Sequence, residues 1–427
     1  MPLQPVPAAR QTHLRVRSEM TATRRTRVRL AGLSAFATVL ALVAGAAGVE
    51  LWTRLTWQPL KGVPGFFLSD PVRIQRLAPG YVGWFAGVPV RINQLELRDD
   101  REYRLGKNAN TFRILVLGDS VTFGHGSVYE HTYPHLLEQR LRRWRPDVDW
   151  QVWNAAVPGY NTSQELAQLL QIGPTFQPDL VVVGFFWNDV ADNFRVGEPG
   201  RVARTASAVL SSVYRHVYSI ELYKRAYLQL AWKLSSSNSY RLRVEHLAEE
   251  KDLLADVRQV RDLEDQQLTP FERLTDAEVA SIRCADAPGL APGWNAALKR
   301  ERGWPYWLEA VRRLQEMNRR GAYRVVFFLN MAPLVCPTSD VFYDGGSAEL
   351  DRFYLTILGD GTPAVSTYGE FRRLRPSQMP MASGHAIGNS NVVKAGVLFD
   401  YLRREVLPCV QASAPRPECR NDQTLTR

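Results

Sequence analysis

The chain has 427 residues, of which 45% are apolar and 22% charged, as in an ordinary globular protein, so global disorder is excluded. The net charge is +10. Before residue 30 there is one acid, Glu19, against seven arginines, namely Arg10, Arg15, Arg17, Arg24, Arg25, Arg27 and Arg29. With +6 in this basic tail, only +4 remains for the rest of the chain, which argues against a nucleic-acid-binding protein.

Residues 30–49 form an uncharged run flanked by Arg29 and Glu50. Twenty residues of helix span roughly 30 Å, the thickness of a bilayer core. The preceding arginines favour a cytoplasmic N-terminus, so the sequence predicts a single-pass membrane protein whose main domain is periplasmic or extracellular. Ala44-Gly45-Ala46 fits a signal-peptidase site, so a cleaved signal peptide stays open. The length of the run favours an uncut signal-anchor.

Past a stretch punctuated by proline and glycine that reaches about residue 110, strand and helix patterns alternate. The predicted strands are 112–117, 150–153, 180–183 and 323–329, and the predicted helices between them are 133–144 and 163–172. This alternation predicts a parallel α/β sheet. Residues 398–402 are predicted to lie in a last amphipathic helix, and a loose tail is predicted after Pro408.

A helical insertion is predicted between the third and fourth strands. Its apolar positions recur at helical spacing and are Val209, Val213, Val217, Ile220, Tyr223, Tyr227, Leu230 and Leu234. Such a stripe predicts core packing, with a lid over a site as the alternative. A serine-rich run at 235–239 ends it, a charged helical stretch follows to about 267, and Thr269-Pro270-Phe271-Glu272 predicts a new helix start.

The cysteines are Cys284, Cys336, Cys409 and Cys419. Outside the cytoplasm an even number can pair, and the three possible pairings stay open, with Cys409 and Cys419 close enough in sequence to staple the C-terminal tail. No CxxC or histidine-rich spacing indicates a zinc site, so neither a metal nor a cofactor is expected.

Small and polar residues follow three successive predicted strands. Gly118-Asp119-Ser120 follows the first, Gly159 lies in the loop after the second, and Asn188-Asp189 follows the third. Each motif alone is typical of a turn. Because ligands of parallel sheets sit beyond the carboxyl ends of the strands, the three together predict a site. Ser120 would be the nucleophile, while the Gly159 N–H and the Asn188 amide would donate to an oxyanion.

His385 lies in a loop, residues 383–389, just before the final helix. That loop can return to the end of the first strand, which would set the imidazole beside Ser120 as its base.

These motifs resemble the GDSL/SGNH hydrolase family, in particular its membrane-anchored bacterial members. Ser120 matches the block I serine within the run Leu117-Gly118-Asp119-Ser120, Gly159 the block II glycine, Asn188 the block III asparagine and His385 the block V histidine. The segment after residue 90, with Leu97-Arg98-Asp99-Asp100, also looks like the upstream part of the anchored members. The resemblance implies a flavodoxin-like three-layer α/β/α fold with a central parallel sheet and a helical insertion, preceded by one transmembrane helix.

Two positions depart from the family pattern. Phe186 stands where block III has glycine, which should reshape the loop and keep the donor. Ala382 stands where block V has the aspartate that orients the histidine. A carboxylate from elsewhere or a backbone carbonyl would have to replace it, and the candidate acids are Asp340, Asp344, Asp351 and Asp360.

The expected domains are a basic tail (1–29), a signal-anchor (30–52), a membrane-proximal segment (53–110), a hydrolase domain (111–408) with its insertion at about 200–300, and a tail (409–427). The expected activity is hydrolysis of lipid or envelope carbohydrate esters through an acyl-serine. Two alternatives remain: an O-acyltransferase acting on an envelope polysaccharide, and a catalytically degenerate envelope binding module, which the missing aspartate suggests.

Overall fold

The computed structural model describes residues 9–56, 66–86, 88–191, 193, 216–235, 268–284, 289–382 and 384–410. These residues fall into two units. One contains α1 (Ala9–Thr56) with residues 217–222, and the other contains the rest, including the main sheet.

Five parallel strands make up the main sheet: β5 (Thr111–Gly118), β6 (Asp149–Asn154), β7 (Leu180–Phe185), β8 (Val325–Leu329) and β11 (Ala364–Ser366). Their order across the sheet is β11-β8-β7-β5-β6. In chain order this is the 2-1-3-4-5 arrangement of flavodoxin-like folds, as expected. The three central strands are buried throughout because helices cover both faces of the sheet, and this explains the apolar runs 114–117, 180–183 and 325–329 in their sequences.

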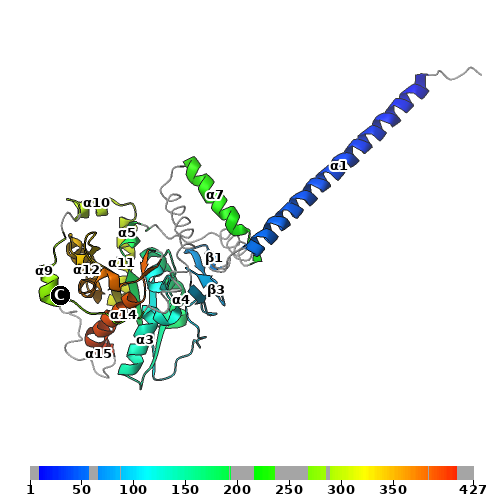
Figure 1. The fold of residues 1–427 in the computed structure, drawn as a ribbon. Coiled ribbons are helices and arrows are strands. Elements are labelled where there is room, and N and C mark those ends of the chain that lie inside the picture. The colour runs from blue at the N-terminus through cyan, green and yellow to red at the C-terminus, as the bar shows by residue number, and fades with distance from the viewer. Residues whose placement is uncertain are drawn as a thin grey trace, which may run out of the picture. The chain divides into compact units, whose positions relative to one another are not determined.

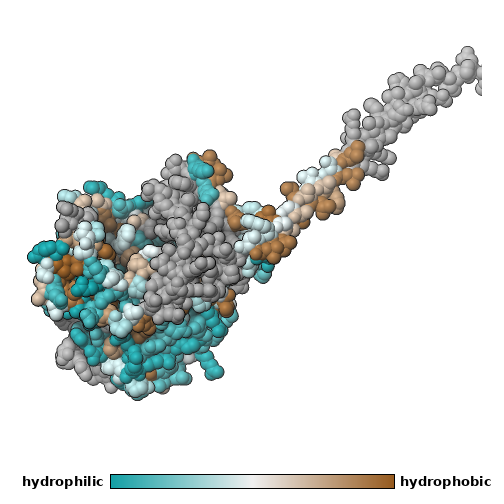
Figure 2. Space-filling model, viewed as in Figure 1, coloured by the Kyte–Doolittle hydropathy of each residue, from teal (hydrophilic) through white to brown (hydrophobic). Residues whose placement is uncertain are grey.

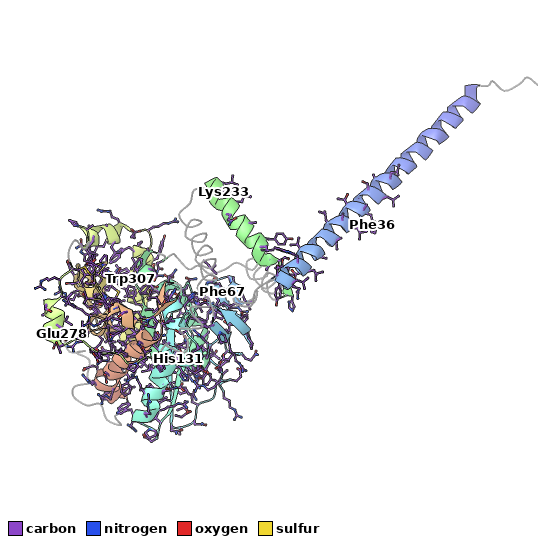
Figure 3. All side chains as sticks on the ribbon, viewed as in Figure 1. Phe36, Phe67, His131, Lys233, Glu278 and Trp307 are labelled. Carbon is purple, nitrogen blue, oxygen red and sulfur yellow. A yellow bond between two sulfur atoms is a disulfide. The ribbon has the colours of Figure 1, made fainter. Side chains whose placement is uncertain are left out.

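Helices flank the sheet on both sides (Figure 1). On one face, α3 (Tyr133–Trp144) and α14 (Asn389–Tyr401) pack on alternate residues of the strands through one apolar core. On the other face, α4 (Thr162–Phe176), α11 (Trp304–Arg319) and α12 (Ser347–Leu358) enclose a second core. Trp307, labelled in Figure 3, is fully buried in that second core.

The early helices match their predicted positions. The bounds of α3 are those expected, with Leu137 and Leu141 buried against the sheet. The start of α4 is fixed by a capping box between Asn161 and Gln164. It then continues past Pro174 to Phe176, one turn beyond the predicted end, because Phe176 is buried in the core.

Two antiparallel hairpins precede the sheet domain. β1 (Phe67–Asp70) pairs with β2 (Ile74–Leu77), and β3 (Val82–Phe85) pairs with β4 (Val88–Arg91). They share one apolar cluster with Phe123, Val157, Tyr160 and Ile387, which lie in the segments beyond the carboxyl ends of the main-sheet strands and before α14. The hairpins therefore pack directly on the segments that carry the predicted site.

The insertion departs from its prediction in two ways. α7 (Ile220–Ser235) ends at the expected serine run, but its stripe is exposed by 50% or more at Tyr223, Tyr227, Leu230 and Leu234, so core packing is wrong for these positions. The predicted helix start at Thr269 is also wrong. The Thr269 hydroxyl accepts from Asn389, and the helix begins later, as α9 (Asp276–Ser281), where Thr275 forms the capping box with Glu278. The stretches around Val209 and up to residue 267 lie outside the described residues.

A disulfide joins Cys284 to Cys336, with the two Cα atoms 5.9 Å apart. This resolves one of the pairings that the sequence left open. Cys419 and the expected loose tail beyond residue 410 lie outside the described residues. A bond of this kind is typical of proteins outside the cytoplasm.

The first unit is dominated by α1. Within it, Leu30–Thr56 is long and apolar enough to cross a membrane by length and composition, and residues 30–49 of this stretch are exposed. Figure 2 shows apolar side chains along the surface of this helix. A transmembrane span and a signal sequence both have these properties.

The remaining elements are short: α2 (Ser120–Phe123), α5 (Asn188–Ala191), α10 (Trp294–Arg300), α13 (Tyr368–Phe371), α15 (Leu407–Val410), β9 (Leu334–Val335), β10 (Phe342–Tyr343), β12 (Met381–Ala382), β13 (His385–Ala386), the 3-10 turns η2 (Tyr129–His131) and η3 (Pro376–Gln378), and the π-helical turn η4 (Leu402–Val406).

Candidate active site

Ser120 is the first residue of the short helix α2, immediately beyond the carboxyl end of β5. The preceding residue, Asp119, caps this helix: its Oδ1 accepts a hydrogen bond from the Val121 N–H at 2.9 Å. The cap fixes the sharp change from strand to helix, and the serine therefore lies at the carboxyl edge of the sheet.

The side chain of Thr122 packs against the carboxyl ends of β5 and β7. Its side chain fills the space beside Gly118 and Gly184, which are paired across β5 and β7, so a Cβ at either glycine would overlap it. Its hydroxyl accepts from the Tyr133 hydroxyl at 3.0 Å. Glycine is therefore required at both strand ends by close packing, and Gly118 in addition has a φ of +155°.

His385 Nε2 lies 2.7 Å from Ser120 Oγ, within hydrogen-bonding distance, although the two residues are 265 positions apart. The histidine is held in β13, which pairs with β12 so that Ala382 stands directly opposite His385. The position that carries the aspartate in the GDSL/SGNH pattern is thus the cross-strand neighbour of the histidine. The structure therefore brings Ser120 and His385 together as the sequence predicted.

The imidazole of His385 lies almost flat on that of His125. The ring centroids are 4.4 Å apart and the planes differ by 25°. His125 also makes a T-shaped contact with Phe85 of the hairpin β3–β4, with the ring centroids 5.3 Å apart. His125 itself belongs to the turn formed by residues 120–127, called the nucleophile turn below. Its backbone N–H donates a hydrogen bond to the Ser120 carbonyl in that turn. Sequence reasoning missed His125, whose only signal was its place five residues after the serine.

Gly159 and Asn188 lie in the loops that leave β6 and β7, the two strands on either side of β5. Gly159 is exposed and has a φ of +79°, a conformation that suits glycine. The Gln75 amide donates to the Pro158 carbonyl at 2.9 Å, so the hairpin β1–β2 supports this loop. Asn188 opens α5, and its Oδ1 has no hydrogen-bond partner within the part of the chain that the structure describes.

Asp189 closes the loop that presents Asn188. Its Oδ2 accepts from the Phe186 N–H at 3.4 Å and from the Thr162 hydroxyl at 3.3 Å, and its carbonyl accepts from the Asn193 amide at 3.0 Å. Phe186 thus takes the position of the usual glycine and contributes only its backbone to the loop closure.

A group of ionisable side chains is buried beneath the nucleophile turn. Burial raises the pKa of Asp119 to about 6, although N–H groups of the α2 turn lower it. Burial also raises the pKa values of Glu165 and Asp189 well above their usual range, and the neighbouring carboxyl groups add to this. Lys394 is the cation of the group: burial lowers its pKa to about 8, against the attraction of Asp119. Burial and mutual repulsion thus favour the neutral forms of Glu165 and Asp189 over their charged forms.

Arg98 holds the far end of the nucleophile turn. Its Nη1 donates to the carbonyls of Phe123 at 2.6 Å and Gly124 at 2.7 Å, and its Nη2 donates to the Ser127 carbonyl. The guanidinium also lies 4.4 Å over the Phe123 ring. Burial lowers the Arg98 pKa to about 9, so the side chain stays charged at neutral pH. This residue lies in the upstream stretch that resembled anchored family members, but the sequence did not indicate its role.

Three of the acids considered as replacements for the block V aspartate are bound elsewhere. Asp340 accepts from the backbone N–H and hydroxyl of Ser377, Asp344 from the Ala348 N–H and the Tyr368 hydroxyl, and Asp351 from the Ser366 hydroxyl. Asp360 is exposed in the turn after α12. Among the described residues, no group of three His, Cys, Asp or Glu side chains is arranged to hold a metal ion.

Residues 116–278 match the model of the GDSL-like Lipase/Acylhydrolase family, and this range begins in β5 and includes the turn of Ser120. The match covers 163 of the 427 residues, so this similarity concerns a part of the chain. The order of the strands in the sheet and the contact between Ser120 and His385 are those that the resemblance to this family led us to expect.

Among curated proteins, the chain is similar to an arylesterase of Vibrio mimicus, with 36% identity over 77 residues. The matched part is 18% of this chain and 38% of the relative, so the chain spans well under half of the relative's length.

The comparison with solved structures finds an acetylxylan esterase from Geobacillus stearothermophilus, in the form of a catalytic mutant (11% identity, TM-score 0.35, covering 72% of this chain and 97% of that one). Another is a two-domain esterase active on acetylated mannans (12% identity, TM-score 0.31, covering 72% and 52%). A third is an α/β hydrolase from the metagenome of Lake Arreo, Spain (13% identity, TM-score 0.32, covering 68% and 94%).

Proposed function

We propose that the chain is a serine ester hydrolase that works outside the cytoplasm, tethered to the membrane by an uncut N-terminal helix. The observation that carries the proposal is the 2.7 Å contact between Ser120 Oγ and His385 Nε2 at the carboxyl end of the sheet. A serine hydroxyl is a weak nucleophile until an adjacent base takes its proton, and this contact supplies the base.

In the proposed reaction, His385 Nε2 accepts the proton of Ser120 Oγ as that oxygen attacks the ester carbonyl carbon. The oxyanion accepts hydrogen bonds from the backbone N–H groups of Ser120 and Gly159 and from the Asn188 amide. His385 then returns the proton to the leaving alcohol oxygen, which leaves an acyl-Ser120 ester. A water molecule attacks this ester, with His385 as base again, and releases the carboxylic acid.

His125 is the residue that we propose to position His385. Its ring covers one face of the base and is tied by its backbone to the Ser120 carbonyl. A flat aromatic neighbour restricts rotation of the imidazole out of the plane in which Nε2 meets Ser120 Oγ. It also places π density over the imidazolium that forms during the reaction, a contact worth about 0.5–2 kcal/mol.

Tethering outside the cytoplasm is supported by two features. The arginine-rich tail precedes a helix that is long and apolar enough to span a bilayer, which favours a cytoplasmic N-terminus. The Cys284–Cys336 disulfide is stable in an oxidising compartment. Intact-mass measurement of the protein purified from membranes tests the tether: a chain that begins after Ala46 would refute it.

The activity is tested by labelling the purified full-length chain with a fluorophosphonate probe, alongside turnover of aryl acetates and acetylated oligosaccharides. The variants are Ser120→Ala, His385→Ala and, as a control, Ser281→Ala, whose hydroxyl lies on an exposed turn of α9. The proposal expects labelling and turnover that require both Ser120 and His385 and that survive in the control. A folded wild-type protein that neither labels nor cleaves any ester would refute it and favour a binding module.

The same assay distinguishes hydrolysis from acyl transfer. With a sugar acceptor present, a hydrolase releases one acid for every alcohol, whereas a transferase releases alcohol without a matching amount of acid.

A further inference from the structure

We propose that Gln75 of the hairpin β1–β2 is a positioning residue, which directs the Gly159 N–H toward the oxyanion of the reacting ester. This inference rests on the proposed function, because it assigns a support to one of the oxyanion donors named there. Gln75 lies upstream of all four motifs that carry the resemblance to the hydrolase family.

The contact that carries the inference joins Gln75 to the peptide group between Pro158 and Gly159. Its Nε2 donates a hydrogen bond to the Pro158 carbonyl oxygen at 2.9 Å. The same Nε2 lies 3.5 Å from the position that a Cβ on Gly159 would take, so the amide lies against this glycine. Among the described residues, no other hydrogen bond reaches the Pro158 carbonyl. The orientation of this peptide group therefore depends on Gln75.

The Pro158 carbonyl and the Gly159 N–H belong to one planar peptide group. The peptide bond is trans, so the two groups point in opposite directions. A donor that fixes the carbonyl therefore also fixes the direction of the N–H, which points away from Gln75. Because a hydrogen bond to the carbonyl polarises the peptide group, the N–H also becomes a stronger donor. Gln75 can thus act on the oxyanion through the peptide group, without touching the substrate.

The residue before this peptide group is attached to the main sheet. The Val157 N–H donates to the Gly118 carbonyl at 2.9 Å, at the end of the strand that leads to Ser120. The loop is therefore held to β5 at Val157 and to the hairpin at the next carbonyl. Its two attachments relate the Gly159 N–H to the nucleophile.

Two further hydrogen bonds hold the hairpin on this loop and on the helix that follows. The Tyr160 hydroxyl donates to the Gln75 carbonyl at 2.5 Å, and the Gln164 amide of α4 donates to the Arg73 carbonyl at 2.6 Å. Burial raises the pKa of Tyr160, so its hydroxyl stays protonated and remains a donor. Figure 1 shows the hairpin, labelled at β1, beside α4. The backbone on both sides of residue 74 is therefore fixed relative to the candidate site.

The backbone of Ile74, which directly precedes Gln75, is strained. Its φ of +71° is unfavourable for a β-branched residue. Its side chain is 47% exposed, so burial of the side chain does not explain the conformation. Strain of this kind persists where neighbouring contacts impose it, and here the hydrogen bonds at Arg73 and Gln75 do so. The strain agrees with a hairpin that presents Gln75 to the Gly159 peptide group.

The test is turnover of an aryl acetate by the full-length chain in detergent, with kcat and KM measured separately. Three substitutions separate the donor of Gln75 from its shape. Gln75→Met removes the donor, Gln75→Glu keeps the shape but its carboxylate only accepts, and Gln75→Lys keeps a donor on a chain of similar length.

We expect Gln75→Met and Gln75→Glu to lower kcat about tenfold or more, with less than about a twofold change in KM, because the N–H meets the oxyanion only in the transition state. This loss is smaller than the 10²–10³ typical of removing an oxyanion donor outright. Gln75→Lys should keep kcat within about threefold of the wild type, since its amine can still donate to the Pro158 carbonyl.

Gln168→Met is the matched control. Gln168, which is buried in α4, also donates through its Nε2 to a carbonyl of the same loop, that of Ala155, at the same distance of 2.9 Å. Its loss should lower the Tm at least as much as the loss of Gln75. It should leave kcat within about twofold of the wild type, because the Ala155 carbonyl belongs to a different peptide group from the Gly159 N–H.

A wild-type kcat in Gln75→Met or Gln75→Glu, in an enzyme that Ser120→Ala inactivates, would overturn this inference and leave the proposed function standing. Equal slowing by Gln168→Met and Gln75→Met would also overturn it, because general loosening of the loop would then explain both. A folded wild-type protein that cleaves no ester would refute the proposed function and this inference together.

Discussion

Replacing Arg98 by methionine tests whether the buried guanidinium holds the nucleophile turn. In the wild type its donors bind the carbonyls of Phe123, Gly124 and Ser127, which follow Ser120 around the turn. Methionine keeps much of the apolar stem and removes every donor.

The size of the expected loss in stability depends on which hydrogen bonds each of the three carbonyls keeps in the variant. Gly124 O still accepts from the Ser127 N–H at 3.0 Å, and Phe123 O keeps a long contact of 3.4 Å to the Asn154 amide. Ser127 O loses its charged donor and becomes an orphan, which costs about 1–3 kcal/mol. Two further charge-assisted bonds are lost, and relief of the cost of burying the charge offsets part of this. We expect a net loss of about 3–5 kcal/mol, which lowers the Tm by about 10 °C.

The measurement is thermal unfolding of the full-length chain followed by tryptophan fluorescence, together with the rate of fluorophosphonate labelling at a temperature where both proteins are folded. Arg98→Lys should fall between wild type and Arg98→Met, because a lysine is a single point donor. Arg145→Met is the control: the side chain of this arginine lies at the surface and pairs with Asp147 there, so its loss should leave the Tm close to that of the wild type. A Tm for Arg98→Met within about 2 °C of wild type would refute the reasoning.

Four further predictions concern the site. His125→Ala should lower kcat by roughly 2- to 30-fold with little change in KM. His125→Phe should keep most of the wild-type kcat, because phenylalanine can also stack on His385. If only a polar residue at position 125 keeps the wild-type kcat, the stacking role is contradicted. Ala382→Asp places a carboxylate opposite His385 and should raise the rate of labelling at least about tenfold; no gain would mean that the base is already fully oriented. Asn188→Ala should lower kcat by about 10²–10³, and a normal rate would contradict its oxyanion role. Glu165→Gln should flatten the pH dependence of unfolding: burial raises the folded pKa of Glu165 above its unfolded value, so the wild type loses stability as pH rises from that unfolded value through the folded one, whereas glutamine does not titrate. Urea unfolding at pH 5 and pH 8 measures the free energy of unfolding at each pH. An equal change in this free energy between the two pH values in both proteins would refute the prediction.

Local sequence was sufficient for the elements whose pattern and burial agree. β7 and residues 114–117 of β5 are apolar because helices cover both faces of the sheet, and α3 has the bounds that its apolar spacing predicted. Turn chemistry misled at Thr269, because its hydroxyl is used by Asn389, a residue 120 positions away. The capping box at Thr275 was the competing local signal.

The candidate residues themselves were readable from sequence because each stands at the carboxyl end of a predicted strand or just before a helix. Ser120 and His385 meet as expected, since the 2-1-3-4-5 strand order and the hairpin before α14 bring both to one edge of the sheet.

Tertiary structure alone decided how that site is supported. Three contacts join residues that are far apart in the chain. His125 stacks on His385, Arg98 donates hydrogen bonds to three carbonyls of the turn after Ser120, and the hairpins β1–β2 and β3–β4 pack on the loops of the candidate site. The choice of Cys284 with Cys336 among the possible pairings also joins distant residues. Periodicity and turn propensity report on neighbours along the chain, whereas these contacts depend on which distant side chains the folded sheet brings within a few ångströms.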